Sequence, residues 1–307
     1  MKANIITPVV TALDHSGKPD YEANKKIIDF LIQNQVDGIL VLGSTGEFTE
    51  FSAQEKRDFL EFYADYVQGR TELYAGTGST NFQETLELSN AAYDMGYRAA
   101  LVIPPYYFGM RQEQLFAYYD ALAKGLKGDL YIYNYPERSG LSVSGDSLRR
   151  LIRENTNVAG MKDTSVDPSH TNQICRAAEG TRFQTYSGYD DQFLYNLAAG
   201  GAGVIGALSN VVPDLWSDLV RAARAEDFQR TMALMGLIDK LVQIYGLGAS
   251  TASLVKMLLN RRGVEISPKS IFPFEEGESV AYQAAKKLLD EVLAEYEQMK
   301  AGWKETC

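Results

Sequence analysis

The chain has 307 residues, of which 45% are hydrophobic and 23% charged, and its formal net charge is −10. This acidic balance, with no basic stripe, argues against a nucleic-acid partner, and no apolar stretch approaches the roughly 18 residues that a membrane span requires. The two cysteines, Cys175 and Cys307, lie far apart, so we expect no disulfide framework and a cytoplasmic protein.

Apolar strand-like segments alternate with amphipathic helix-like segments along most of the chain. The predicted strands are Ala3–Val10, Gly38–Leu42, Leu73–Gly76, Ala99–Ile103, Leu130–Tyr133, Val158–Met161, Phe183–Ser187 and Gly203–Gly206. Helical spacing of apolar residues predicts helices between them, such as Tyr21–Gln33, Ala53–Val67, Asn81–Met95 and Gln112–Ala123. Repeated strand–helix units imply right-handed parallel crossovers, which close into a (β/α)₈ TIM barrel of the α/β class. An open doubly wound sheet would instead require a glycine-rich phosphate turn after the first strand, where the chain has Thr7-Pro-Val-Val-Thr11.

Beyond about residue 225 the strand pattern stops and only helices are predicted. Asp227–Ile244, Ala252–Leu259 and Val280–Met299 have helical spacing, and the two prolines of Ile266–Phe274 indicate an extended connector. We therefore expect residues 1–224 to form the catalytic barrel and residues 225–307 to form a C-terminal helical extension packed on it.

Lys162 ends the predicted sixth strand, in the segment Gly160-Met-Lys-Asp163. A lysine at the end of a buried apolar strand holds its amine in a partly desolvated place. Burial disfavours the protonated form of an amine, and a neutral amine can attack a carbonyl carbon. The common alternative is a lysine that only extends to solvent at a strand end, and its neighbours decide between the two.

Functional residues of such barrels lie at the carboxyl ends of the strands and in the loops that follow. That rule selects, together with Lys162, the segments Gly43-Ser-Thr-Gly-Glu47, Pro104-Pro-Tyr-Tyr107, Tyr133-Asn-Tyr-Pro-Glu-Arg-Ser-Gly140, Gly188-Tyr-Asp-Asp191 and Ile205-Gly206. Single members have structural explanations: Ser44 or Thr45 could cap a helix, and Arg138 could be a solvated surface charge. Tyr133 could belong to the barrel core with its hydroxyl at the rim.

Together, these residue types suit Schiff-base chemistry. Carbinolamine formation needs a proton carrier, and a tyrosine polarised by neighbouring hydroxyls suits that role. The N–H groups and hydroxyls of a glycine turn can hold the carboxylate of a 2-oxo acid, and an arginine can clamp a second carboxylate. The two histidines, His15 and His170, lie in polar loop-like surroundings, so neither a zinc site nor a histidine-based triad is expected.

Four segments resemble the dihydrodipicolinate synthase / N-acetylneuraminate lyase family of class I aldolases: Gly43-Ser-Thr-Gly-Glu47, Tyr133-Asn-Tyr-Pro136, Gly160-Met-Lys-Asp163 and Gly200-Gly-Ala-Gly-Val-Ile205. The resemblance extends over essentially the whole chain. It implies pyruvate bound as a Schiff base on Lys162 and a small aldehyde as the second substrate, with neither metal nor cofactor. The catalytic residues that it implies are Lys162, Tyr133 as proton shuttle, Thr45, and Tyr107 reaching across a dimer interface. The implied substrate-binding residues are Ser44, Thr45, Gly46, Arg138, Gly188 and Ile205, and the implied assembly is a homotetramer built as a dimer of dimers.

The second substrate distinguishes the subfamilies. Arg138 matches the arginine with which the synthases bind the carboxylate of aspartate semialdehyde, and Ala207 stands where neuraminate lyases have a serine. Conversely, Ser44 replaces the threonine usual in synthases, and Gly188-Tyr-Asp-Asp191 resembles the sugar-acid aldolases and lyases more. We expect a 4-hydroxy-tetrahydrodipicolinate (dihydrodipicolinate) synthase. The alternative is a 2-keto-3-deoxy sugar acid aldolase or an N-acetylneuraminate lyase-like enzyme, and a remote alternative is a non-catalytic binding protein on the same scaffold.

Lysine-inhibited synthases of this family hold the effector in a polar pocket at the dimer interface, which Glu84 and Tyr106 match here. Phe48 stands where a small polar residue is usual, and Lys56 where a neutral histidine is. Phe48 takes up volume, and Lys56 places a second cation beside the ammonium group of the effector. We therefore expect no inhibition by L-lysine at physiological concentration.

Overall fold

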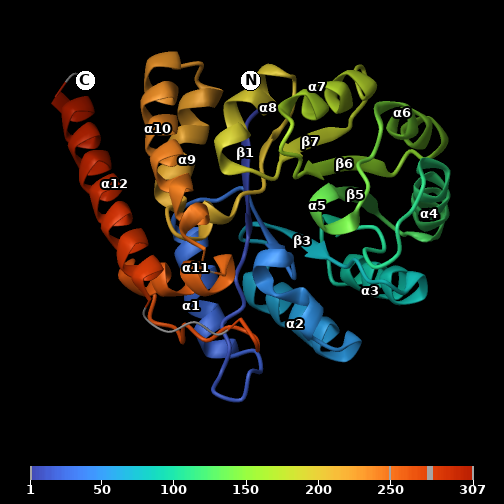
Figure 1. Ribbon diagram of the computed structural model, residues 1–307, viewed down its shortest axis with the longest axis horizontal. Helices are drawn as coiled ribbons and strands as arrows, with labels where there is room; N and C mark the ends of the chain where they lie inside the picture. The colour runs from blue at the N-terminus through green and yellow to red at the C-terminus, as the bar shows by residue number, and fades with distance from the viewer. Residues whose placement is uncertain (1, 249, 275–278, 306–307) are drawn as a thin grey trace.

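The computed structural model describes residues 2–248, 250–274 and 279–305, and its centre is a closed barrel of parallel strands (Figure 1). The strands follow one another around the barrel in chain order, and the last pairs with the first. They are β1 (Asn4–Pro8), β2 (Gly38–Val41), β3 (Glu72–Gly76), β4 (Ala99–Val102), β5 (Asp129–Asn134), β6 (Val158–Asp163), β7 (Gln184–Ser187) and β8 (Gly203–Val204). The predicted (β/α)₈ barrel is confirmed.

Helices connect the strands and surround the barrel (Figure 1). They are α1 (Tyr21–Gln33), α2 (Ala53–Val67), α3 (Phe82–Asp94), α4 (Gln112–Gly125), α5 (Pro136–Ser139), α6 (Gly145–Glu154), α7 (Pro168–Ala177), α8 (Phe193–Ala198) and α9 (Pro213–Arg224). Short 3₁₀ helices are η1 (Ser44–Gly46), η2 (Phe48–Glu50), η3 (Asp190–Gln192) and η4 (Ala207–Asn210). The bounds predicted for α1 and α2 are confirmed, because capping side chains mark both starts: Asp20 accepts from the Ala23 N–H, and Ser52 forms a capping box with Glu55.

Every strand differs from its predicted bounds by one or two residues at an end, and contacts with other parts of the chain explain the differences in the first and the sixth. The first ends at Pro8 because the Val10 N–H leaves the ladder and donates to Asn210 Oδ1 at 3.1 Å. The sixth continues to Asp163 because its last residues pair with β5 on one side and β7 on the other. Partners from distant parts of the chain set these ends, so the local sequence could not show them.

The last part of the chain is helical and packs along one flank of the barrel (Figure 1). It comprises α10 (Phe228–Leu241), η5 (Val242–Leu247), α11 (Thr251–Arg261) and α12 (Val280–Glu305). Leu234 and Ile238 of α10 and Leu289 and Val292 of α12 are buried in one hydrophobic cluster with residues of the first strands. The division at residues 224 and 225 stays a prediction, and Cys307 lies outside the described residues. None of the helices within the described ranges combines the length and apolar character that crossing a membrane requires.

Three tyrosines fill the barrel near the amino-terminal ends of its strands. The ring centroid of Tyr131 lies 5.7 Å from that of Tyr74 and 6.2 Å from that of Tyr186. All three side chains are buried. Since a TIM barrel is a packed core and not a pore, the polar groups of the carboxyl-terminal mouth have a closed floor beneath them.

Candidate active site

Lys162 and Tyr133 occupy paired positions on the neighbouring strands β6 and β5. Both residues are only 5% exposed, and Lys162 Nζ lies 4.6 Å from the centroid of the Tyr133 ring. Paired residues on adjacent parallel strands point to the same face of the sheet, so the amine and the phenol share one environment. The structure therefore brings together the two residues for which the sequence predicts the central chemical roles.

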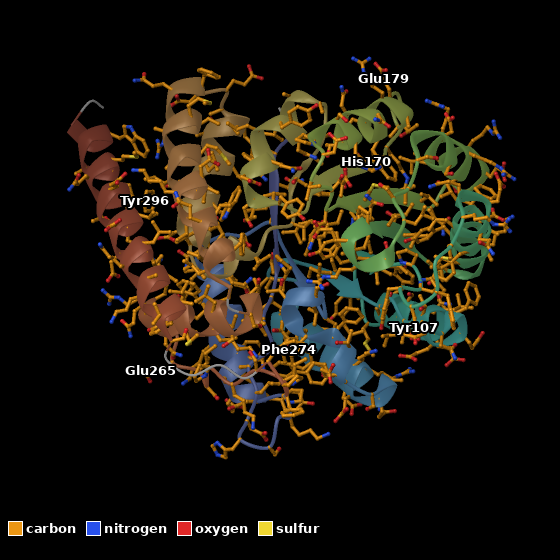
Figure 2. The ribbon with its side chains drawn as sticks, in the orientation of Figure 1. Tyr107, His170, Glu179, Glu265, Phe274 and Tyr296 are labelled. Carbon is orange, nitrogen blue, oxygen red and sulfur yellow. The ribbon has the colours of Figure 1, made fainter. Side chains whose placement is uncertain are left out.

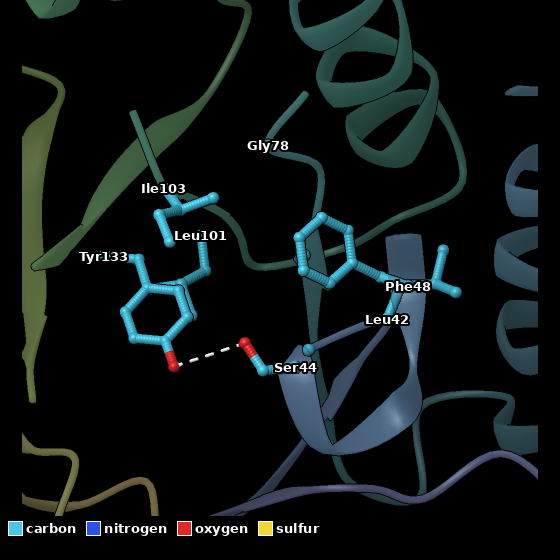
Figure 3. A pocket seen from close by; sticks show the side chains of 9 residues that line it. Leu42, Ser44, Phe48, Gly78, Leu101, Ile103 and Tyr133 are labelled. Atoms are coloured by element: carbon cyan, nitrogen blue, oxygen red, sulfur yellow. Dashed lines mark hydrogen bonds between the residues drawn. The ribbon is translucent and has the colours of Figure 1, made fainter. Parts of the chain in front are cut away.

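The turn after β2 adds hydroxyl groups beside the phenol. Ser44 Oγ lies 3.5 Å from Tyr133 Oη (Figure 3), and Thr45 is half-buried next to it. Thr11 Oγ1 donates to the Gly46 carbonyl at 2.8 Å and so ties the turn to the end of β1. A Cβ on Gly46 would lie 2.9 Å from the Val9 carbonyl oxygen, so this close approach requires glycine. The predicted binding residues of this turn all lie at the mouth.

A pocket opens between Tyr133 and this turn (Figure 3). It is lined by Leu42, Gly43, Ser44, Phe48, Gly76, Gly78, Leu101, Ile103 and Tyr133. Most of the lining is apolar, and the Ser44 and Tyr133 hydroxyls supply its polar end. Sequence reasoning missed Gly78, although a glycine after the third strand is a signal: a Cβ there would come within 2.9 Å of the Ile103 backbone nitrogen.

Asp190, on η3 after β7, is a buried carboxyl group close enough to Lys162 to feel its charge. Its Oδ2 accepts a hydrogen bond from Tyr245 Oη at 2.8 Å. Burial raises the pKa of Asp190 to about 7, although the Tyr245 hydroxyl, the Leu208 N–H and the Lys162 charge each lower it. A Cβ on Gly206 would overlap this carboxylate, so the chain after β8 needs glycine there. Asp190 lies in the segment Gly188–Asp191 that the barrel rule selected, but the sequence assigned it no role of its own.

Gly188 and Ile205 follow β7 and β8 at the mouth. The Gly188 N–H donates to the Asp163 carbonyl at 2.7 Å, and the Ile205 N–H donates to the Ser187 carbonyl at 2.9 Å. A side chain at Gly188 would overlap Thr164, and Ile205 is buried. The structure thus places Gly188 beside the end of β6 and Ile205 beside the end of β7, and their contacts with a substrate stay predictions.

Arg138 lies on α5 at the rim of the mouth. Its guanidinium carbon is 5.8 Å from the centroid of the Tyr135 ring, and a hydrogen bond to Tyr135 raises the pKa of Arg138 further. The Tyr135 ring stacks in turn on Tyr133, with centroids 5.7 Å apart. The exposed Arg138 guanidinium is therefore linked through the stacked rings of Tyr135 and Tyr133 to the amine of Lys162. Tyr135 is thus a further site residue, to which the sequence assigned no role.

Tyr107 lies apart from these groups within one chain. It is 80% exposed in the loop after β4 and packs edge-on against Phe108 (Figure 2). Among the described residues, no hydrogen bond joins it to Tyr133, whose hydroxyl partner is Ser44. A role for Tyr107 in another subunit stays a prediction.

The prediction that His170 lies in loop-like surroundings is wrong. His170 is on α7, which begins with Pro168 at its first turn and is capped by Asp167, whose side chain accepts from the Ser169 N–H. An aspartate followed by proline is a helix-start signal that the sequence contained. The imidazole is largely buried, and its Nδ1 lies 2.8 Å from Asp163 Oδ2.

The chain matches the family model for the dihydrodipicolinate synthetase family over residues 1–292. It belongs to this family. It is 33% identical over 213 residues to a 4-hydroxy-tetrahydrodipicolinate synthase of Kosmotoga olearia, a match that covers 69% of this chain and 72% of that protein. It is 29% identical over 289 residues to the probable 2-dehydro-3-deoxy-D-pentonate aldolase YjhH of Escherichia coli, covering 94% of this chain and 96% of that protein. The solved structure of Escherichia coli YagE in complex with pyruvate matches with a TM-score of 0.91 at 29% identity, covering 94% of this chain and 98% of that one.

These findings confirm the family predicted from the four segments. Its members are lyases and aldolases, and the chain is a carbon–carbon lyase of this kind. The relatives include both kinds of enzyme that the sequence suggested, a synthase and a sugar-acid aldolase.

Proposed function

We propose that the protein binds pyruvate as a Schiff base on Lys162 and joins it to a small aldehyde. The observation that carries the proposal is the buried Lys162 amine 4.6 Å from the ring centre of Tyr133, whose hydroxyl faces Ser44. YagE, which this chain resembles over 94% of its length, was solved with pyruvate.

The chemistry follows from these groups. The Lys162 amine attacks C2 of pyruvate, and Tyr133 delivers a proton to the oxygen that leaves as water. Loss of a proton from C3 converts the resulting imine into an enamine, whose C3 forms a bond to the aldehyde carbon. The aldehyde oxygen takes up a proton as this bond forms. Water, or the amino group of the second substrate where it carries one, then displaces the Lys162 amine from the imine carbon, which releases an open-chain or a cyclic product and restores the amine. The hydroxyls of Ser44 and Thr45 hold the pyruvate carboxylate and assist Tyr133.

For the aldehyde we propose aspartate semialdehyde, which makes the reaction that of a 4-hydroxy-tetrahydrodipicolinate synthase. The Arg138 guanidinium at the rim, stacked over Tyr135, supports this choice because arginine binds a carboxylate with two parallel hydrogen bonds. The 33% identity to the Kosmotoga olearia synthase supports it as well.

A 2-keto-3-deoxy sugar acid aldolase is the second candidate. It is supported by the likeness to YjhH over 94% of the chain. The buried Asp190 carboxyl beside Lys162 also supports it, because carboxyl groups accept hydrogen bonds from sugar hydroxyls.

The Arg138→Ala variant separates the two candidates in steady-state assays with pyruvate and either aldehyde. Loss of a charged hydrogen bond costs about 1.5–3 kcal/mol, so KM for aspartate semialdehyde should rise roughly ten- to a hundredfold while KM for D-glyceraldehyde changes little. Arg149→Ala, at an exposed arginine on α6, is the matched control. Wild-type turnover that is faster with glyceraldehyde, together with an unchanged Arg138→Ala variant, would establish the aldolase instead.

The assembly and location proposed with this function are a homotetramer of two dimers in the cytoplasm. The exposed pair Tyr107 and Phe108 after β4 supports a subunit interface at this loop, where a tyrosine could complete the partner's site. Sedimentation of wild-type protein and of Tyr107→Ala tests this, and the variant should lose both the tetramer and most of kcat.

A further inference from the structure

The alignment of Lys162 with Tyr133 depends on the register between β6 and β5, and that register is irregular. Leu130 pairs with Val158, but the next residue, Tyr131, pairs with Gly160, so Ala159 is skipped. A strand that contains such a bulge must have its register fixed beyond the irregularity.

The residues that follow the catalytic pair provide this fixation. Asn134 and Asp163 come next on β5 and β6, and their side chains leave the sheet on the face opposite to Tyr133 and Lys162. Asn134 Nδ2 donates to Asp163 Oδ1 at 2.7 Å, directly between the two strands. This bond can form only in the register that also pairs Tyr133 with Lys162.

Asp163 is fully buried, so its carboxylate needs further partners. Two further partners come from α7, which lies outside the barrel wall (Figure 1). Thr171 Oγ1 donates to Asp163 Oδ2 at 2.9 Å, and His170 Nδ1 lies 2.8 Å from the same oxygen. Figure 2 labels His170 on this helix. On its other side, His170 Nε2 lies 2.8 Å from the Val143 carbonyl oxygen. The Val143 N–H in turn donates to Asn134 Oδ1 at 2.9 Å, which closes the network.

The protonation of His170 follows from these partners. His170 Nε2 also lies 3.0 Å from the Ser142 hydroxyl, which can either donate or accept. The Val143 carbonyl oxygen only accepts, so its 2.8 Å contact assigns a hydrogen to Nε2. Nδ1 faces a carboxylate that already accepts from Thr171 and Asn134. An imidazole with acceptors at both nitrogens is an imidazolium. Burial lowers the pKa of His170, but the hydrogen bond and charge of Asp163, the Val143 carbonyl and the charge of Asp167 raise it, and the net shift is upward. The nearby Cys175 thiol faces the same carboxylate. Burial raises the pKa of Cys175, a hydrogen bond with Thr185 opposes that shift, and the charge of Asp163 adds a smaller upward contribution.

We propose that His170 is a positioning residue, an imidazolium that holds the Asp163 side chain and so fixes the register of the strands that carry Lys162 and Tyr133. The inference rests on the proposed function, because it assigns a task to a group that does not contact the substrate. The stabilising contribution is complete below the ordinary histidine pKa of about 6.5 and is lost as pH rises through the raised pKa of His170. Deprotonation leaves the Nε2 lone pair facing the Val143 carbonyl oxygen, so the network weakens and activity should fall at higher pH.

Imidazole NMR tests the protonation state directly, because His15 and His170 are the chain's two histidines. In ¹⁵N-histidine-labelled His15→Gln protein, both ring nitrogens of His170 should stay protonated until a midpoint above about 6.5. Asp163→Asn should lower that midpoint. A midpoint at or below the ordinary value would overturn the proposal, and this readout requires no variant of His170.

Kinetics of His170→Gln test the consequence, with His15→Gln, at an exposed position, as the matched control. We expect kcat to fall on the order of tenfold and KM for pyruvate to change little. In the wild type, kcat should decline at high pH with the midpoint seen by NMR, and this high-pH limb of the kcat profile should disappear in the variant. The control should keep both kcat and the limb. Unchanged kcat and pH profile in His170→Gln would overturn the proposal.

Borohydride trapping of pyruvate separates this failure from a failure of the proposed function. If wild-type protein forms an adduct on Lys162 but the variant behaves like wild type, only the role of His170 is contradicted. If wild-type protein forms no adduct, the proposed function fails, and the positioning role fails with it.

Discussion

Two buried lysines, Lys162 in the barrel mouth and Lys256 in the C-terminal extension, have opposite surroundings. Lys256, on α11, is 0% exposed, forms an ion pair with Glu47, and donates to the Lys269 carbonyl at 2.8 Å. Burial lowers the pKa of Lys256, and the Glu47 charge opposes that shift. Lys162 lies against the Tyr133 ring, and no ion pair engages it among the described residues.

The difference shows how the partner decides what a buried amine does. A lysine paired with a carboxylate is held as an ammonium group and has no lone pair for a carbonyl carbon. Glu47 directly follows the turn of Ser44 and Thr45, and its Oε1 accepts from the Ile271 N–H at 2.9 Å. Lys256 therefore anchors the turn of the mouth through Glu47, whereas Lys162 is in no ion pair among the described residues.

Replacing Lys162, the lysine proposed to react, should have the largest effect. Lys162→Arg keeps charge and bulk but stays protonated, so turnover should fall on the order of 10⁴-fold or more while the thermal midpoint changes little. Lys256→Arg is the matched control and should keep measurable turnover. Substantial activity in Lys162→Arg would remove the distinction between the two lysines.

The proton-transfer role of Tyr133 predicts the next largest effect. Tyr133→Phe removes one oxygen and little packing, so the free energy of unfolding should stay nearly unchanged. The value of kcat should fall by a factor of about 10² to 10⁴. Tyr135→Phe, one position along the stacked pair, should have a much smaller effect on kcat. If Tyr133→Phe keeps most of wild-type kcat, the proton takes another route.

Breaking the structural pair should reduce stability instead. Lys256→Met leaves Glu47 buried without its cation, which costs about 3–5 kcal/mol in free energy of unfolding. The double variant Lys256→Met/Glu47→Leu should recover part of that loss. Denaturant titrations measure both, and the folded single variant should still form the pyruvate adduct on Lys162. An unchanged free energy of unfolding would show that the pair is not structural.

The surroundings of a third buried lysine, Lys56, lead us to expect that L-lysine does not inhibit the reaction. Its Nζ lies 3.3 Å from Glu84 and 5.8 Å from the centroid of the Phe48 ring, which packs edge-on against Tyr106. The carboxylate expected to receive L-lysine thus already has a cation beside it. Rates should stay constant with L-lysine up to about 1 mM, within the usual range of effector affinities. Cooperative inhibition below that concentration would contradict this prediction and favour a regulated synthase.

Local patterns and the barrel rule were enough to predict Lys162 and Tyr133, because strand periodicity located the strand ends and those ends meet at one mouth. Asp190 followed the same rule but lacked a local sign of its burial, which depends on Tyr245 from the C-terminal extension. The contacts of His170 and Lys256 join residues on separate elements. Such contacts have no periodicity, so only the folded structure reveals them.

Reduction with borohydride in the presence of pyruvate, followed by peptide mass mapping, tests the central claim most directly. The Lys162 amine, buried against Tyr133 and in no ion pair among the described residues, should carry the reduced adduct, and the paired Lys256 should carry none. An adduct on Lys256 or another lysine, or no adduct on the wild-type protein, would contradict the account.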